Sequence, residues 1–303
     1  MLARCLASIQ RHAPPHTEVI VVDDGSPAGC VTTTAARFDG VRVVQIPKSK
    51  GFCTAVNAGV AVAQGEIVEL LNDDTEVLPG WAEPALAWFD DPTIGAVAPL
   101  VLKGPSGAMI DSAGDRYFIG GIAAKRKRGE PVCDAPKKAH AVFGACGSSA
   151  FYRREALRKV RGFPEEFMAY SDDIDVAFRL HRGRWRTMHE PASRVLHHVS
   201  ASYGQPVGRL LEQQSLNEER VFWRNLPAGE LFRALPLHFA VLAAKGVRRW
   251  REGNLRPFVR GRLRVLGEIR QLLQHRRRLR EIGDCAPVSC WEVERRYWFV
   301  ADR

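Results

Sequence analysis

Two adjacent carboxylates, Asp73 and Asp74, directly follow an apolar run at residues 67–71. We expect this run to form a buried strand, and ligands of an open α/β sheet bind just beyond the carboxyl ends of its strands. Carboxylate oxygens at that position suit a divalent cation that carries a diphosphate. Taken alone, Asn72-Asp73-Asp74 is more typical of a polar turn, because Pro79-Gly80 follows. The cation hypothesis therefore depends on the rest of the chain.

A second acidic group, formed by Asp172, Asp173 and Asp175, follows Ser171, which we expect to cap a helix. Carboxylates are favourable at a helix N-terminus, and this is the structural explanation for the group. Three acids within four residues also repel one another, which favours a functional site. A pair of histidines that begins at His197 follows a short apolar run further on, and it could supply another metal ligand.

Strands and helices alternate in the first hundred residues. The expected elements are strands at 19–22, 41–46, 67–71 and 94–102 and helices at 51–64 and 81–89. The first of these strands ends in a polar turn that contains Asp23 and Asp24. The alternation predicts βαβ units and a doubly wound α/β sheet. Such sheets usually begin with a strand, whereas this chain begins with a short amphipathic helix that contains Leu2, Leu6 and Ile9.

Residues 103–140 are rich in glycine, proline and charge, and we expect them to form a long functional loop. Its basic run at 125–128 favours a solvated or phosphate-facing loop over a nucleic-acid site. A strand is expected at 142–152, with small residues from Gly144 to Ser149 at its centre. Small side chains there would let a ligand approach closely.

The composition is that of an ordinary globular protein: 46% of the 303 residues are hydrophobic and 26% are charged. The seven cysteines are scattered and form no Cys-x-x-Cys pair, which predicts reduced thiols in a cytosolic compartment and no zinc site. We expect no signal peptide, since arginine interrupts the first apolar residues, and no apolar run long enough to span a membrane.

The positive charge is concentrated in residues 207–303, which contain 20 Lys and Arg against 11 Asp and Glu. We therefore expect a main domain at 1–206 and a basic helical extension at 207–303, with helices at 215–223, 231–244 and 257–280. An apolar stripe on the last helix consists of Val259, Leu263, Leu266, Ile269 and Leu273. Two interpretations remain open: the stripe lies on an anionic membrane surface, or it packs on the main domain. Nucleic acid is disfavoured, because no tryptophan platform is evident.

Taken in order, five segments resemble the family 2 glycosyltransferases of the GT-A fold, which are inverting enzymes that use nucleotide sugars. The likeness is greatest to the bacterial branch that includes rhamnosyltransferases of O-antigen and other cell-envelope polysaccharides. The segments are Val19 to Ser26, Gly51 to Gly59, Leu70 to Asp74, Gly162 to Arg179 and His197 to Ser202. Each motif is weak alone, and their order over about two hundred residues makes the resemblance specific.

The resemblance implies a role for each group of polar residues. Asn72-Asp73-Asp74 stands at the family's Asp-x-Asp position, so Asp74 would bind Mg²⁺ or Mn²⁺ together with His197. The Asp172-Asp173 pair corresponds to the family's Glu-Asp pair, with Asp173 as the catalytic base. The nucleotide contacts would be Asp23, Asp24, Asn57 and Asp73. The acceptor pocket would include Gly144, Trp185 and Asp175.

These roles define an expected reaction and location. The metal ion would neutralise the leaving nucleoside diphosphate, while the base removes the proton of an acceptor hydroxyl and the anomeric configuration inverts. The partners would be a nucleotide-diphosphate sugar donor and a glycan or lipid-linked acceptor, with no nucleic acid. The protein would be cytoplasmic, with peripheral attachment to the inner face of the plasma membrane through the basic extension.

The chain departs from the family at its start. Family members begin with an apolar strand, whereas no such strand precedes the first expected helix of this sequence. We expect the coding sequence upstream of Met1 to continue in frame with such a strand. The alternative is a catalytically inactive remnant that binds a nucleotide sugar or a glycan. The retained Asp74, Asp173 and His197 favour the enzyme. A nucleotide-dependent dehydrogenase is disfavoured, since no Gly-x-Gly-x-x-Gly motif follows the first strand.

Overall fold

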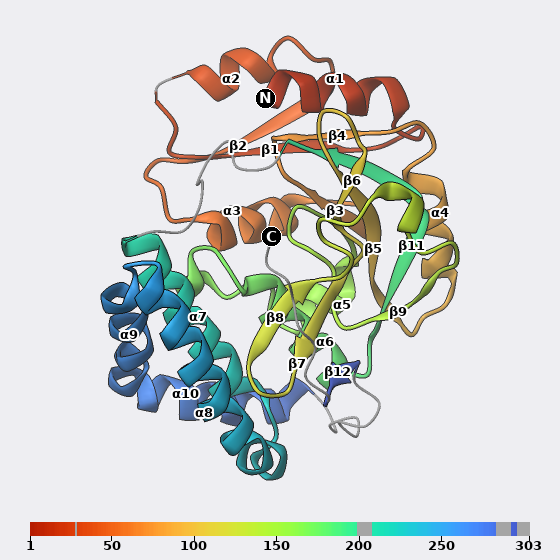
Figure 1. Ribbon diagram of the computed structural model, residues 1–303. Coiled ribbons are helices and arrows are strands. Elements are labelled where there is room, and N and C mark those ends of the chain that lie inside the picture. The colour runs from red at the N-terminus through yellow and green to blue at the C-terminus, as the bar shows by residue number, and fades with distance from the viewer. Residues whose placement is uncertain (28, 199–207, 283–291, 296–303) are drawn as a thin grey trace.

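The computed structural model describes residues 1–27, 29–198, 208–282 and 292–295. A mixed seven-stranded sheet forms its centre (Figure 1). The main path through this sheet is β3 (Ile67–Leu71), β10 (Ser149–Arg153), β5 (Ile94–Lys103), β11 (Arg186–His197) and β4 (Thr75–Val77). Every residue of β5 except the last is buried, as expected of a central strand. Strands β5 and β11 run parallel, so their carboxyl ends lie at the same edge of the sheet.

Strands β1 (Val19–Asp24) and β2 (Val41–Ile46) form a separate parallel pair, in the register Val19–Val41 to Asp24–Ile46. Among the described residues they pair with no strand of the larger sheet. The helices of this part are α1 (Leu2–His12), α2 (Cys30–Ala35) and α3 (Phe52–Val62). The expected elements at 19–22, 41–46, 51–64 and 67–71 are therefore confirmed. A further strand upstream of Met1 stays a prediction.

The segment 103–140 contains strands, so its prediction as one long loop was wrong. Its strands are β6 (Met109–Ser112), β7 (Asp115–Phe118) and β8 (Ile122–Lys125), and β9 (His140–Val142) begins at its end. These strands form because each has a partner to pair with: β6 lies antiparallel to the buried β5, and β7 forms a hairpin with β8. Conversely, the single strand expected at 142–152 is interrupted, because residues 143–148 form a loop between β9 and β10.

The shorter helices of the main domain surround the sheet. They are α4 (Ala82–Leu86), which leads into a 3-10 turn at Ala87–Asp90, α5 (Arg154–Lys159) and α6 (Asp172–Arg182). The helix predicted at 81–89 is thus two short pieces. Helix α6 packs against α7 (Arg209–Asn225), the first helix of the C-terminal extension.

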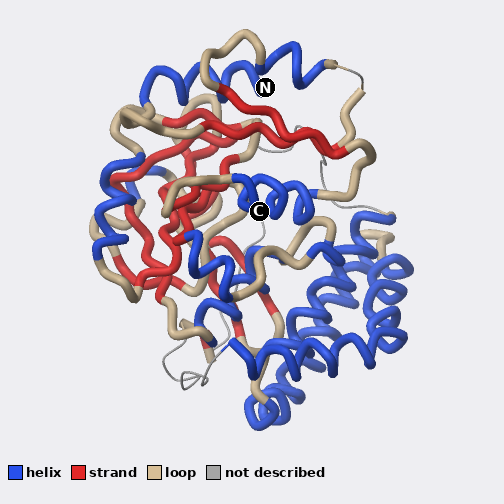
Figure 2. Tube along the Cα trace, turned by 180° about the vertical axis from the view of Figure 1, so that it is seen from behind, coloured by secondary structure: helices blue, strands red, loops and turns tan. Residues whose placement is uncertain are grey.

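The extension continues with α8 (Ala228–Arg251), α9 (Leu255–Arg264) and α10 (Ile269–Arg278). A 3-10 turn at Val265–Glu268 divides the predicted third helix into α9 and α10. These helices cluster at one side of the molecule (Figure 2). The short strand β12 (Val293–Glu294) pairs with β7, which returns the chain to the main domain. The expected boundary between 206 and 207 lies at the edge of residues 199–207, which are outside the described part, so the division into two domains stays a prediction.

The apolar stripe on the last helices is exposed. Relative exposures are 40% for Val259, 58% for Leu263, 61% for Leu266, 51% for Ile269 and 53% for Leu273. The interpretation that this stripe packs on the main domain was therefore wrong. Within the described helices, none combines the length and the hydropathy needed to cross a bilayer.

Candidate active site

Asp74 and His197 meet at the edge of the main sheet because β4 and β11 pair antiparallel, with Thr75 opposite His197. Asp74 directly precedes β4, and its Oδ1 lies 3.2 Å from Nε2 of His197. The backbone N–H of His198 also donates to the carbonyl of Asp74 at 2.8 Å, which fixes the turn. Two residues that are 123 positions apart in the sequence thus form one buried pair.

Asp111 of β6 holds the other side of the imidazole, with 3.0 Å between its Oδ2 and Nδ1 of His197. Its carboxylate is fully buried and pairs with Nζ of Lys125 at 2.7 Å. Burial alone would raise the pKa of Asp111, but His197 and Lys125 hold it below its usual range. Burial likewise opposes the charged form of His197, yet the neighbouring carboxylates of Asp111 and Asp74 raise the pKa of His197. Asp111 was missed because it lies in the segment predicted to be a loop.

The Asp74–His197 pair has the chemistry of a divalent-cation site. A carboxylate oxygen and an imidazole nitrogen are ligands for Mn²⁺, and adjacent ligands at ~2.1 Å from an octahedral cation lie about 3 Å apart. The observed 3.2 Å matches this separation. Oδ1 of Asp74 is buried and has no well-aligned hydrogen-bond donor among the described residues. Asp111 would then orient the imidazole through Nδ1, as carboxylates do for metal-bound histidines. These residues fit a bound cation.

Asp172 and Asp173 begin helix α6. Oδ2 of Asp173 accepts a hydrogen bond from the backbone N–H of Gly147 at 3.1 Å, and Oδ1 accepts one from Ile174 at 2.8 Å. Burial raises the pKa of Asp173, and burial together with the adjacent Asp173 raises the pKa of Asp172 well above its usual value. The expected Ser171 cap is wrong: Ser171 occupies the N-cap position with φ of 61°, but its side chain makes no capping hydrogen bond.

The loop at 143–148 brings the two acidic groups together. The carbonyl of Ser148 accepts a hydrogen bond at 3.0 Å from the backbone N–H of Asn72, which is two residues before Asp74. The neighbouring Gly147 donates to Asp173 at 3.1 Å. The segment that carries the candidate metal ligand and the candidate base therefore contact neighbouring residues of one short loop.

A second group of possible metal ligands includes Asp173 itself. Single ligand atoms of Asp115, Cys146 and Asp173 all lie within 4.8 Å of one another. Burial raises the pKa of the Cys146 thiol to about 11, even though Lys125 opposes this shift. A cation would have to displace the thiol proton and tolerate the charge of Lys125. The donor set of Asp74 and His197 is therefore the better match to Mn²⁺ or Mg²⁺.

Asp23 and Asp24 lie at the carboxyl end of β1, as predicted. Asp24 accepts hydrogen bonds from the backbone N–H groups of Lys50 and Gly51, both at 2.8 Å, and so fixes the turn that starts α3. Asp23 accepts one from the backbone N–H of Ser26 at 2.9 Å. Asp73 is exposed beside the buried Asp74. Their predicted contact with the nucleotide stays a prediction.

Asn57 has a structural partner on both sides of its amide. Its Nδ2 donates to the carbonyl of Phe163 at 2.9 Å, and its Oδ1 accepts from the backbone N–H of Phe163 at 2.8 Å. These bonds tie α3 to the turn before α6. The predicted contact of Asn57 with the nucleotide stays a prediction.

The three predicted acceptor-pocket residues have structural contacts of their own. Asp175 is fully buried in ion pairs with Arg179 and Arg224. Trp185 precedes β11, whereas His197 is its last residue, so the two lie at opposite ends of a strand of 12 residues. At Gly144 an added Cβ would meet Ala177 at 2.8 Å, so the missing side chain lets α6 approach. The assignment of these three residues to an acceptor pocket stays a prediction. Residues 199–202 of the histidine motif lie outside the described part.

Comparison with known proteins shows the family of the chain. The model of "Glycosyl transferase family 2" matches residues 1–161. N-acetylglucosaminyl-diphospho-decaprenol L-rhamnosyltransferase of Mycobacterium tuberculosis is 28% identical over 298 residues, which cover 86% of this chain and 94% of that protein. Pre-mycofactocin glycosyltransferase of the same organism is 33% identical over 182 residues, 59% of this chain and 37% of that protein.

Solved structures agree on the fold. GalNAc-T7, crystallised with UDP, GalNAc and Mn²⁺, has a TM-score of 0.57 at 15% identity, over 78% of this chain and half of that chain. Residues 1–349 of TarS from S. aureus have a TM-score of 0.50 at 15% identity, over 78% of this chain and 66% of that chain. These likenesses support the GT-A fold that the sequence predicted. The chain belongs to glycosyl transferase family 2.

Proposed function

We propose that the protein is a metal-dependent, inverting glycosyltransferase that moves a sugar from a nucleotide diphosphate to a hydroxyl of a glycan or lipid-linked glycan. The observation that supports this proposal is that the loop at 143–148 contacts both Asp173 and the chain segment that leads to the Asp74–His197 pair. A cation site and a carboxylate base beside one another are the two parts that a direct displacement requires.

The residues of the chain divide the chemistry between them. Asp74 and His197 would hold Mn²⁺ or Mg²⁺, which would neutralise charge on the leaving diphosphate when bound. Asp173 accepts the proton of the acceptor hydroxyl, and its carboxylate is aimed by the N–H groups of Gly147 and Ile174. Asp23 and Asp24 at the end of β1 are the candidate nucleotide contacts. One displacement without a covalent intermediate inverts the anomeric carbon.

The acceptor class follows from the relative that aligns along most of the chain. That protein is named for the transfer of L-rhamnose to N-acetylglucosaminyl-diphospho-decaprenol, and the alignment covers 86% of this chain. A lipid-linked glycan acceptor at the cytoplasmic face of the membrane, in cell-envelope polysaccharide synthesis, is therefore our proposal for this chain.

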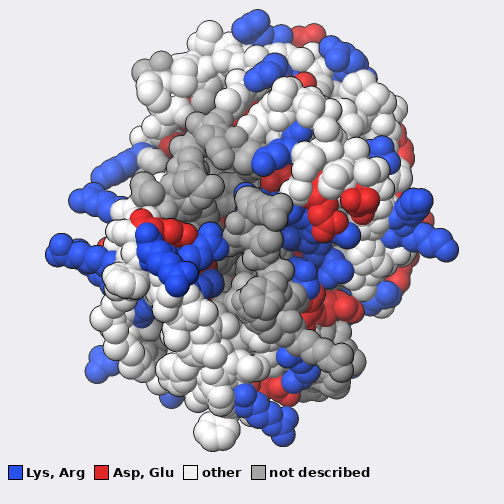
Figure 3. All heavy atoms as spheres, in the orientation of Figure 1, with Lys and Arg blue, Asp and Glu red and all other residues white. Residues whose placement is uncertain are grey.

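The C-terminal extension offers a surface for such a membrane. Large apolar side chains are exposed on α8 to α10, among them Phe232 at 76%, Trp250 at 68% and Leu266 at 61%. Arginines accompany them, and residues 207–303 carry a net charge of +9. Lys and Arg side chains are scattered over the side of the molecule that α8 and α9 form, between larger areas of uncharged surface (Figure 3). Apolar area and positive charge on one face suit an anionic bilayer surface.

The decisive experiment is a nucleotide-release assay across UDP-, GDP- and dTDP-sugars with Mn²⁺. We expect release from one donor, and we expect its loss in Asp173→Asn, in Asp74→Asn and on addition of EDTA. Isothermal titration of the same donors accompanies the assay. Donor binding without turnover of any donor, in the presence of acceptor extracts, would instead establish an inactive binding protein. Turnover that survives both substitutions would overturn the assigned base and metal ligand.

A further inference from the structure

The loop before helix α6 has an unusual backbone. Met168, Tyr170 and Ser171 have φ of 61°, 72° and 61°, although none of them is glycine. Side chains disfavour this left-handed region, so such residues persist only where the surroundings hold them in place, often at functional sites. The loop leads directly into Asp172 and Asp173.

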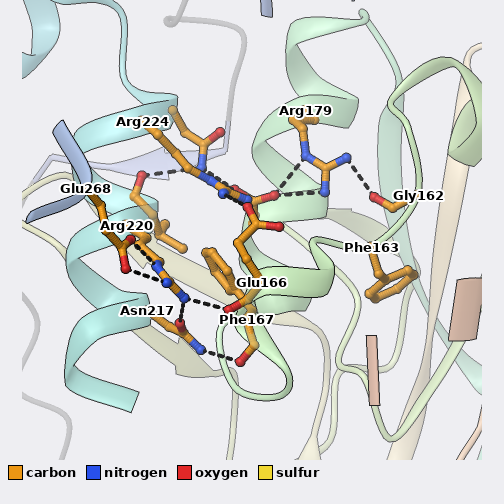
Figure 4. A network of polar contacts seen from close by, with 12 residues as sticks. Gly162, Phe163, Glu166, Phe167, Arg179, Asn217, Arg220, Arg224 and Glu268 are labelled. Carbon is orange, nitrogen blue, oxygen red and sulfur yellow. Dashed lines mark hydrogen bonds and ion pairs between the residues drawn. The ribbon is translucent and has the colours of Figure 1, made fainter. Parts of the chain in front are cut away.

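Asn217 of α7 holds this loop from the side of the C-terminal extension. Its Nδ2 donates to the carbonyls of Phe167 at 3.0 Å, Ala169 at 2.8 Å and Tyr170 at 3.0 Å. Two N–H hydrogens thus serve three carbonyls, and one of them is shared. Asn217 is fully buried. Figure 4 shows its side chain directed from α7 at the carbonyl of Phe167.

The orientation of this amide is determined by two donors on its other side. Oδ1 of Asn217 accepts hydrogen bonds from Nη1 of Arg220 at 2.9 Å and from Nε2 of Gln213 at 3.1 Å. Arg220 is itself held by both carboxylate oxygens of Glu268 (Figure 4). A flipped amide would set its oxygen against three carbonyl oxygens, so the N–H groups face the loop.

Helix α3 holds the same loop from the opposite side. The backbone N–H of Cys53 donates to the carbonyl of Met168 at 3.1 Å. A Cβ at Gly51 would lie 3.0 Å from Cα of Met168, so only glycine allows this approach. Gly51 in turn donates to Asp24 at 2.8 Å. The loop is clamped between the candidate nucleotide side and the C-terminal extension.

We propose that Asn217 is a positioning residue for the transfer reaction, acting through the loop at 168–171 on the direction of the Asp173 carboxylate. The inference rests on the proposed function of Asp173. It makes α7 a part of the catalytic apparatus, since the residue that shapes the base lies in the extension. The donor site depends on other residues, so this role affects turnover and not donor binding.

The test is Asn217→Asp, which keeps the size of the side chain and replaces the donating amide with an acceptor. We expect kcat to fall about 10- to 100-fold, while the donor KM stays within about twofold and the protein remains folded. We also expect amide hydrogen exchange in residues 167–173 to become at least about tenfold faster. The matched control is Glu212→Gln, a carboxyl-to-amide exchange on the same helix that breaks only the pairs with Arg264 and Arg260.

Several outcomes would overturn the inference. One is an unchanged kcat in Asn217→Asp, and another is a donor KM that rises in proportion to the loss of kcat. The others are a loss of kcat that the unfolded fraction of the variant explains, or an equal loss of kcat in the control. If the wild-type protein transfers no sugar, the proposed function fails. Amide hydrogen exchange of residues 167–173 in Asn217→Asp then decides separately whether Asn217 holds the loop. Unchanged exchange would refute this contact, and faster exchange would show that Asn217 has a structural role only.

Discussion

Asp175 of α6 accepts a hydrogen bond from Nε of Arg224 on α7 at 2.7 Å, and both side chains are buried. The second carboxylate oxygen accepts from Nε of Arg179 at 2.8 Å. Arg224 also pairs with Glu166 at 2.5 Å. The helix that begins with the candidate base and the first helix of the extension are therefore joined by buried charge, not only by apolar packing.

Substitution Asp175→Asn should strongly destabilise the protein. It leaves Arg179 and Arg224 buried without their shared carboxylate, and breaking a buried pair in this way costs about 3–5 kcal/mol. The free energy of unfolding from urea denaturation measures the effect. The control is Glu155→Gln, which removes an exposed pair with Lys159 and should change nothing measurable. A loss no larger than in the control would mean that this network does not stabilise the fold.

The same carboxylate should make stability depend on pH. Burial alone would raise the pKa of Asp175, but Arg224 and Arg179 hold it well below the usual value. An ionised Asp175 thus stabilises the fold above the unfolded pKa of about 3.9, and this contribution is lost as the pH falls further. Unfolding measured from pH 6 down to pH 3 should show a steeper loss in the wild type than in Asp175→Asn. Parallel curves would contradict this assignment.

Substitution Asp111→Asn should weaken metal binding without abolishing it. Asp111 accepts from Nδ1 of His197, and loss of such a partner typically lowers metal affinity 10- to 100-fold. Mn²⁺ affinity is measured by electron paramagnetic resonance of the free ion, which needs no turnover. Asp134→Asn, an exposed carboxylate of the same segment, is the control and should leave the affinity unchanged. Equal affinities in the two variants would remove Asp111 from the metal site.

The acidic groups and the histidine pair stood out in the sequence because each lies at the end of a strand or the start of a helix, where local patterns are informative. The individual roles of Asp74, Asp173 and His197 came from the resemblance to the family. Asp111 was out of reach, since β6 exists only through its pairing with β5 and has no periodicity of its own. The same holds for Lys125, which reaches Asp111 from β8.

For two of the predicted acceptor-pocket residues, the sequence also carried a signal for a different role. Asp175 and Arg179 are four apart on a helix, and that spacing is typical of an ion pair. Trp185 precedes a strand, whereas ligands bind beyond the ends of strands. The structural contact of Asn57 could not be predicted from the sequence, because its partner Phe163 is 106 positions away and becomes its neighbour only in the folded chain.

Activity should fall as the pH falls through the raised pKa of Asp173. Burial raises the pKa of this carboxyl, and only its ionised form accepts the proton of the acceptor. The acid limb of kcat should therefore lie above the value of about 3.9 for an unperturbed Asp. Measurement at two saturating Mn²⁺ concentrations separates this limb from the titration of His197. A midpoint that moves with the Mn²⁺ concentration would assign the limb to the metal site.

The exposed face of α9 and α10 should bind anionic membranes. Leu263 and Leu266 are 58% and 61% exposed, and each CH₂ group that enters a bilayer contributes about 0.8 kcal/mol. The double substitution Leu263→Ser and Leu266→Ser should lower binding to phosphatidylglycerol vesicles at least about tenfold, while release of nucleotide in solution stays the same. Leu86→Ser, at an exposed leucine of α4, is the control. Unchanged vesicle binding would refute the assignment, and a wild-type dimer that the double variant dissociates would assign this face to a second copy of the chain.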